Sequence, residues 1–109
     1  MANGTYTQEG IMSQIFVAFG QGTGTLRVSH DAVAVLRGLY FDAITPEIVS
    51  TEWATEAVQV LERIRALGRL AALKAVTRGD TTVSAEDVSS SAATVQIQSD
   101  TAFCPPLKP

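Results

Sequence analysis

The glycine-rich segment at residues 20–24 (Gly-Gln-Gly-Thr-Gly) is the first place where residue types and spacing suggest chemistry. Glycines let a backbone approach a phosphate closely, and such loops bind nucleotides when a Lys and a Ser or Thr complete them. Here Thr25 and Leu26 follow, and the segment contains no Lys. A dinucleotide loop needs a strand, a helix and a second strand, whereas the residues after Ser29 have a helical pattern. We therefore interpret residues 20–24 as a flexible break between two elements.

The acid–base and nucleophilic residues do not combine into a catalytic set. His30 is the single histidine, and beyond its neighbour Asp31 it has no partner at a recognisable catalytic spacing. Glu86 and Asp87 are adjacent, so they point to different faces of a helix and cannot act as a pair. The chain has a single cysteine, Cys104, so it cannot form an intramolecular disulfide. One cysteine and one histidine are also too few for a typical metal-ligand cluster. We predict no catalytic residue and no metal site in this chain.

The basic residues are concentrated in one part of the chain. The net charge is −3, from 8 Lys plus Arg and 11 Asp plus Glu, which argues against a free-standing nucleic-acid-binding protein. Between residues 57 and 79, however, Glu62 is the single acid among the basic residues Arg63, Arg65, Arg69, Lys74 and Arg78. Arg65 and Arg69 are one helical turn apart and share a face. This charge is either a solvated helix face or an anion-facing surface, on which Arg65, Arg69 and Arg78 would face DNA or phosphate.

The length and composition fit one small domain. The chain has 109 residues, of which 46% are hydrophobic but only 6% aromatic, so its core must be built largely from Ala, Val, Leu and Ile. Such a core is thin, and a partner or parent domain would complete it. We expect a disordered leader at residues 1–10, a helical domain at 11–97 and a disordered tail at 98–109. Because neither a signal-peptide pattern nor an apolar run of membrane-span length is found, we expect an intracellular protein without membrane contact.

The hydrophobic pattern predicts an all-α fold, a small helical bundle. Residues 11–19 are apolar and fit either a short helix or a buried strand. Ser29 is the expected N-cap of a helix that runs to about residue 44, with Asp31 in its first turn, and Pro46 separates this helix from the next. Its predicted apolar stripe consists of Ala32, Leu36, Leu39 and Ala43.

A long helix is expected next, starting between Pro46 and Trp53 and ending near Thr77. Gly68 within it costs about 1 kcal/mol relative to Ala unless a neighbouring element packs closely there. Gly79 can take the left-handed conformation that ends the helix. The stripe comprises Trp53, Ala57, Val60, Leu61, Ile64, Leu67 and Ala71.

The last helix carries the clearest local signal. Residues 84–87 (Ser-Ala-Glu-Asp) form a capping box, in which the Ser hydroxyl accepts the amide of Asp87 and the Asp carboxylate reaches back. This role is sufficient to account for Asp87. The stripe that follows consists of Val88, Ala92 and Val95.

Several of these segments together resemble the end of the AAA+ module of minichromosome maintenance (MCM) helicases. In that family an aromatic-Ile-Ala-Tyr-Ala-Arg stretch leads to Arg-Leu-Ser and an acidic-Ala helix, in which Leu and Tyr follow at the spacing of Leu36 and Tyr40. Residues 16–19 (Phe-Val-Ala-Phe) and 27–32 (Arg-Val-Ser-His-Asp-Ala) occupy the places of the first two motifs here. The family's closing Val-x-x-Glu-Asp-Val is similar to residues 83–88 (Val-Ser-Ala-Glu-Asp-Val).

The resemblance covers about residues 11–100 and implies the C-terminal lid of an AAA+ ATPase. Residues 59–62 (Gln-Val-Leu-Glu) stand where the family has Arg-Gln-Leu-Glu, so Gln59 takes the position of the second-sensor arginine that reaches ATP across a subunit boundary. Gln lacks the charge of that arginine, and Arg63, one turn further on, is the candidate substitute. Gln59 and Arg63 are therefore the expected nucleotide-facing residues.

The function implied by the resemblance is that of a helicase part without catalysis of its own. Such a lid covers ATP bound between subunits and supports ATP-driven DNA unwinding in replication or repair, in the nucleus of a eukaryotic cell. Its partners are the AAA+ core and the neighbouring subunits, with DNA contacted indirectly. The Walker motifs and the first sensor of the family are missing from this chain, so ATP and Mg would be held only by the parent or partner core.

Two other interpretations remain open. Residues 30–97 also fit a histone fold, with a short, a long and a short helix, which would make the chain a heterodimerisation subunit of a chromatin or transcription complex. Asp80 stands where such proteins usually have a DNA-contacting Arg or Lys, and this interpretation leaves residues 16–19 unexplained. The other interpretation is a helical interaction module with no nucleotide connection.

Overall fold

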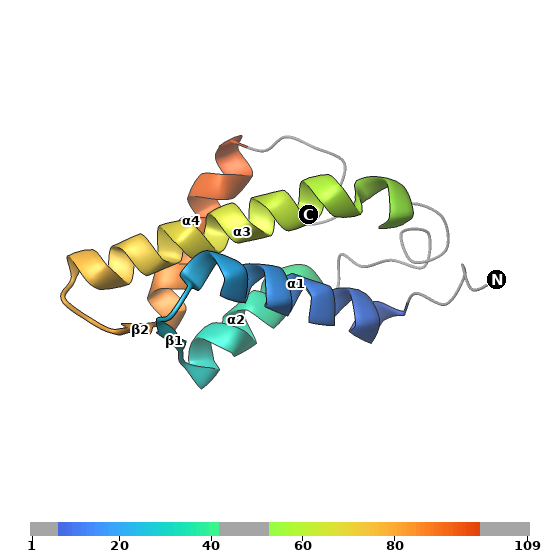
Figure 1. Cartoon of the computed structure of the whole chain (residues 1–109). Helices are drawn as coiled ribbons and strands as arrows, with labels where there is room; N and C mark the ends of the chain where they lie inside the picture. Colours follow the sequence, from blue (N-terminus) through green and yellow to red (C-terminus); the bar gives the residue numbers. More distant parts are fainter. Residues whose placement is uncertain (1–6, 42–52, 99–109) are drawn as a thin grey trace.

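A mostly helical domain forms in residues 7–41 and 53–98, the two ranges that the computed structural model describes (Figure 1). Within these ranges there are four helices and a two-stranded parallel sheet. The elements in chain order are α1 (Gln8–Thr23), β1 (Arg27–Val28), α2 (His30–Tyr40), α3 (Trp53–Thr77), β2 (Thr82–Val83) and α4 (Ala85–Gln98). The prediction of a small helical bundle is confirmed at this level, and the sheet is an addition to it.

The helix starts follow from their capping residues. Ser29 caps α2 as predicted, because its hydroxyl accepts the amide of Ala32 at 3.0 Å. Thr7 caps α1 in the same way through the amide of Gly10, at 2.9 Å. As a result α1 begins at Gln8, inside the range expected for the leader, and residues 11–19 are helical rather than a strand. The expected extension of α2 to residue 44, Pro46 and the tail after residue 98 lie outside the described residues.

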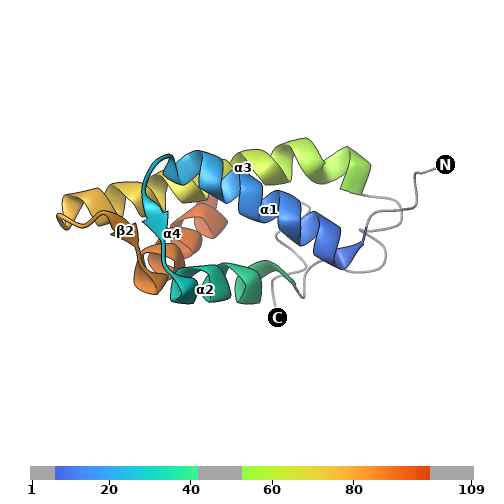
Figure 2. The same ribbon diagram turned by 60° about the horizontal axis from the view of Figure 1, so that its bottom comes forward.

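The core lies around α3, which has α1 along one side and α4 crossing it (Figures 1 and 2). Helix α2 packs mainly on α4. From the predicted stripes, the buried members are Ala32, Leu36, Trp53, Val60, Ile64, Leu67, Ala71, Val88 and Ala92, while Leu39, Ala57 and Leu61 are partly buried. Helix α1 adds Ile11, Met12, Ile15, Ala18 and Phe19. The core is therefore mainly aliphatic, as the composition required.

Two glycines allow α1 and α3 to approach closely. A Cβ at Gly22 would lie closer than 3.0 Å to the backbone carbonyl oxygen of Arg65, and a Cβ at Gly68 would lie closer than 3.0 Å to that of Phe19. Gly68 therefore meets the condition under which a glycine inside a helix is required, because a neighbouring element packs closely against it. The prediction of a flexible break at residues 20–24 is wrong, because residues 20–23 form the last turn of α1 and only Gly24, at φ 67°, ends it.

The two short strands join parts of the chain that are distant in sequence. Arg27 is paired with Thr82 and Val28 with Val83, in parallel. Hydrogen bonds on either side extend the pairing, from the amide of Arg27 to the carbonyl of Thr81 (3.1 Å) and from the amide of Ser29 to that of Val83 (3.0 Å). Strands of two residues have no period that a hydrophobic pattern can reveal, so the sequence did not predict them.

A bidentate ion pair links α1 to α2 where the two helices make few other contacts. Arg37 Nη2 donates to Glu9 Oε2 at 2.9 Å and Nη1 to Oε1 at 3.3 Å, and the guanidinium lies over the Phe41 ring, 4.0 Å from its centroid. The hydrogen bonds to Arg37 hold the pKa of Glu9 below its usual value. None of the described helices has the length and hydropathy needed to cross a membrane.

Candidate functional site

Gln59 and Arg63 lie one turn apart on the same side of α3. The Gln59 side chain is exposed, and its amide makes no hydrogen bond within the described residues. Arg63 is half-buried, and its Nη2 is enclosed without a hydrogen-bond acceptor in the described part of the chain. A guanidinium N–H left unpaired away from water is energetically unfavourable, and native structures generally avoid it. Arg63 could therefore gain hydrogen bonds by rotating outward onto an anion.

Arg65 and Arg69 lie on another side of α3, next to α1. Arg65 Nε donates to Gln21 Oε1 at 2.7 Å, and Arg65 Nη1 lies 3.5 Å from Glu62 Oε2. Arg69 is exposed and makes no polar side-chain contact within residues 7–41 and 53–98. The predicted shared face of Arg65 and Arg69 is thus present. Because residues two apart on a helix point in nearly opposite directions, Arg63 is not part of it.

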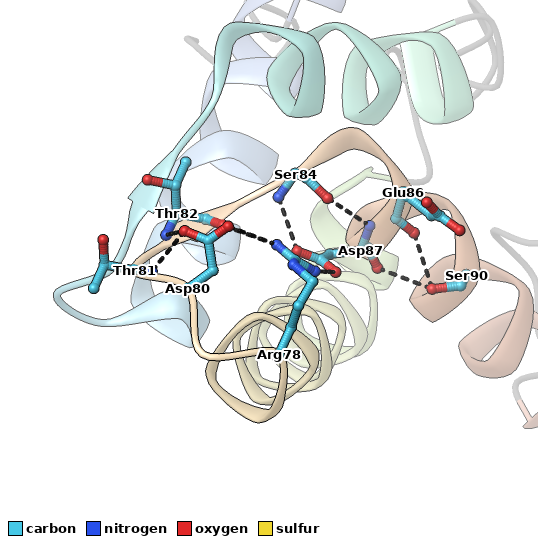
Figure 3. Close-up of polar contacts among 8 residues, drawn as sticks. All are labelled: Arg78, Asp80, Thr81, Thr82, Ser84, Glu86, Asp87 and Ser90. Carbon is cyan, nitrogen blue, oxygen red and sulfur yellow. Dashed lines mark hydrogen bonds and ion pairs between the residues drawn. The ribbon is translucent and has the colours of Figure 1, made fainter.

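Arg78 is held by several acceptors at the turn between α3 and β2 (Figure 3). Its Nη1 donates to Asp87 Oδ1. Its Nη2 lies 3.3 Å from both Asp80 Oδ2 and the carbonyl oxygen of Thr82. These contacts raise the pKa of Arg78, chiefly through the hydrogen bond to Asp87. A guanidinium used in this way has fewer donors left for phosphate, although its side chain is 43% exposed, so the role of Arg78 toward DNA or phosphate stays a prediction.

Asp87 is the buried centre of this cluster, with a side chain only 4% exposed. The predicted capping box is confirmed: Ser84 N donates to Asp87 Oδ2 at 2.9 Å, and Asp87 N donates to Ser84 Oγ at 3.3 Å. The second carboxylate oxygen accepts Arg78, so capping does not account for Asp87 fully. The hydrogen bond from Arg78, followed by those from Ser84, holds the pKa of Asp87 below its usual value against the opposing effect of burial.

The turn that positions Arg78 and Asp80 is a Schellman motif. The amide of Gly79, at φ 82°, donates to the carbonyl of Val76, and the amide of Asp80 donates to that of Ala75, both at 2.9 Å. Asp80 Oδ1 then accepts the amides of Thr81 (2.8 Å) and Thr82 (3.2 Å). These backbone hydrogen bonds, together with Arg78, lower the pKa of Asp80.

No protein-family model, curated protein or solved structure matches the chain. The nucleotide-facing roles of Gln59 and Arg63 therefore stay predictions that rest on the resemblance of residues 59–62. The roles of Arg65 and Arg69 toward DNA or phosphate also stay predictions, which rest on local charge. The structure shows which of these side chains are exposed and which already have hydrogen-bond partners within the chain.

The described residues offer little for a metal ion. No group of three or more His, Cys, Asp or Glu side chains lies together within them. A hollow of about 480 Å³ beside Arg78 is lined by Leu70, Leu73 and Lys74 from α3 and by Glu86 from α4, among others. Its charges are mixed in sign, and the hydroxyl of Ser90 in its wall donates to the main-chain carbonyl oxygen of Glu86 at 2.9 Å rather than to a carboxylate, so its geometry does not indicate a reaction.

Proposed function

We propose that this chain is the helical lid of an MCM-like AAA+ ATPase. In this function the domain packs on a nucleotide-binding core, covers ATP held between subunits and passes the movement that follows hydrolysis to DNA-gripping parts of the ring. ATP and Mg are bound by the core, and the lid supports unwinding in replication or repair without breaking a bond itself. The protein would act inside the cell, in the nucleus of a eukaryote.

The observation that carries this proposal is the meeting of two motif segments that lie far apart in the sequence. Residues 27–32 and 83–88 supply most of the resemblance to MCM helicases. In the structure β1 and β2 pair directly, and each strand leads into a helix capped by a serine, Ser29 or Ser84. Motifs that resemble a family by chance have no reason to be neighbours in space, so their pairing supports the proposal.

The histone-type alternative is less well supported. A subunit of that kind offers the core face of its long helix to a partner subunit. Here the buried face of α3 is covered by α1 and α4 of the same chain, and residues 16–19 belong to the covering helix α1, in which Phe19 is buried (Figure 2). A helical interaction module without a nucleotide connection remains the second candidate, because the domain has exposed apolar side chains that a partner protein could cover, such as Val17 and Val58.

The proposal is tested with a purified MCM-type AAA+ core from which the lid has been deleted. We expect the chain to bind this core about tenfold more tightly with a non-hydrolysable ATP analogue than without it, within the usual range of coupling between two sites. Isothermal calorimetry measures both affinities. Binding that is unaffected by nucleotide, or sedimentation of the isolated chain as a tight obligate dimer, would contradict the proposal.

Replacing Arg63 with methionine separates a functional arginine from a structural one. Met keeps much of the apolar stem and removes an unpaired N–H, so we expect the isolated chain to gain about 1 kcal/mol of unfolding free energy. The same variant should lose the effect of the ATP analogue on core binding. Arg27→Met is the matched control, since its exposed side chain makes no polar contact in the described residues. A destabilised Arg63→Met variant would show that the arginine is held by the fold.

A further inference from the structure

A shallow groove runs between α1 and α3. It has a volume of about 260 Å³ and is lined chiefly by Gln14, Val17, Ala18 and Gln21 from α1 and by Leu61 and Arg65 from α3. Its floor is apolar, although it lies on the surface. The lid function proposed above does not use this groove, although Arg65 in its wall is one of the residues predicted to face DNA or phosphate.

One valine that lines the groove on α1, and two further valines on α3, have exposed side chains. Val17 is 61% exposed, Val58 72% and Val76 56%. Val58 and Val76 are 18 positions apart, which is five full turns of an α-helix, so they lie on one line with Arg65 and Arg69 between them. We call the surface formed by Val17, Val58, Leu61, Arg65, Arg69 and Val76 the valine–arginine face.

The formal charge of this face is weakly positive, because Arg65 and Arg69 outnumber Glu62, which lies beside Arg65 on the same side of α3. Arg69 is free of polar side-chain contacts within the described residues, and Arg65 retains Nη2 as a donor after its contacts with Gln21 and Glu62. Glu62 is the nearest acid and lies 3.5 Å from Arg65. An apolar line with arginines beside it is complementary to a partner whose apolar residues are flanked by carboxylates.

We infer that the valine–arginine face binds an amphipathic helix of a partner protein, with Asp or Glu flanking its apolar stripe. The line from Val58 to Val76 is about 27 Å long at about 1.5 Å per residue, which suits a helix of about five turns rather than a small molecule. Valine and leucine side chains contribute to such an interface by losing contact with water, whereas they add nothing to binding of a phosphate backbone. A protein helix is therefore favoured over DNA.

The probe is a fluorescein-labelled synthetic peptide of about 20 residues, with Leu at helical i, i+3, i+4 and i+7 positions and Glu on both flanks. A second peptide has Lys in place of every Glu. By fluorescence anisotropy we expect the Glu peptide to bind the full chain about tenfold more tightly than the Lys peptide, with the difference decreasing as salt is added. The double variant Arg65→Glu, Arg69→Glu should invert the preference.

Three further variants distinguish this face from a merely electrostatic one. The double variant Val17→Ser, Val58→Ser should bind the Glu peptide several-fold more weakly than the wild type. Because both side chains are exposed, the circular dichroism spectrum of the variant should match that of the wild type. The variant Glu62→Gln should bind the Glu peptide more tightly, because it lacks the acid that competes with the peptide for Arg65. Arg27→Glu, an equal charge reversal on exposed β1, should have little effect.

The inference is overturned by any of three results. The two peptides could bind equally or not at all. A single-stranded oligonucleotide could bind with dependence on Arg65 and Arg69 but none on Val17 and Val58, which would assign the face to nucleic acid. Self-association lost in the valine variants, without peptide binding, would assign it to a second copy. No nucleotide or ATPase core is present in this experiment, so its outcome is independent of the lid proposal.

Discussion

Replacing Gly68 with alanine is expected to lower the free energy of unfolding by about 2–3 kcal/mol, although alanine is the better helix former. The added Cβ would lie closer than 3.0 Å to the carbonyl oxygen of Phe19, and it would also meet Gly22 Cα at 3.0 Å. Both obstacles are backbone atoms, so no side chain can rotate to make room, and α1 must move away from α3. That separation loosens the most extensive helix contact of the domain.

Two glycines of α1 provide a second test and its control. The variant Gly22→Ala should be destabilised as much as Gly68→Ala, because its Cβ would meet the backbone of Arg65 and Arg69. Gly20→Ala, two residues away on the same helix, has nothing within 4 Å and should stabilise by about 0.5–1 kcal/mol. Chemical denaturation followed by the fluorescence of Trp53, the single tryptophan, measures all three variants. Equal effects at Gly20 and Gly22 would contradict the close approach of the helices.

The features that the sequence predicted correctly are those set by local contacts. The cap at Ser29, the capping box at Ser84 and the end of α3 at Gly79 each depend on residues within one turn of one another. The apolar stripes are equally local, since helical spacing alone determines which side chains share a face. A single sequence carries these signals in full.

The features that it missed depend on which segments meet. Residues 20–24 have the composition of a loop, and the packing of α1 against α3 explains the glycine at position 22, inside the helix. The pairing of β1 with β2 joins residues 55 positions apart and leaves no pattern in either segment. The Glu9–Arg37 ion pair also depends on the fold, because 28 positions separate its members.

In the candidate site, too, the local features were predicted correctly and the contacts that depend on the fold were missed. The local charge count grouped Arg63, Arg65, Arg69, Lys74 and Arg78. In the structure the helix turns Arg63 away from Arg65, and the Schellman turn brings Arg78 to Asp87. A signal for the last contact was available. The capping box uses one carboxylate oxygen of Asp87, and an arginine just before a tight turn can reach the other oxygen. Arg65 and Arg69 alone keep the shared face that their spacing predicted.

Neutralising Asp87 is expected to have the second large effect. Asp87→Asn keeps the shape of the side chain but removes the charge that faces Arg78, and its amide group cannot accept two hydrogen bonds from different directions as the carboxylate does. We expect a loss of about 1–3 kcal/mol of unfolding free energy, because the side chain is buried and its partners at Ser84 and Arg78 would be left poorly paired.

The same carboxylate determines part of the pH dependence. The pKa of Asp87 is lowered in the folded chain, first by Arg78, so its stabilising contribution is present above the unfolded value of about 3.9 and is lost as pH falls toward the folded value. Asp80 and Glu9 have lowered pKa values as well and contribute with the same sign. Wild-type stability should therefore decrease below about pH 5, and in Asp87→Asn the decrease should be smaller.

Glu86→Gln is the control for this experiment, because it removes one negative charge from the same turn of α4. Glu86 is exposed and its side chain makes no ion pair in the described residues, so its substitution should change stability by less than about 0.5 kcal/mol. Urea denaturation at a series of pH values between about 3 and 7 compares the two variants with the wild type. If both variants reduce the loss of unfolding free energy at low pH equally, net charge rather than the Arg78–Asp87 contact is responsible for that loss. If Asp87→Asn alone does so, the turn between α3 and β2 is held by this one buried carboxylate, and the position of β2 against β1 depends on it.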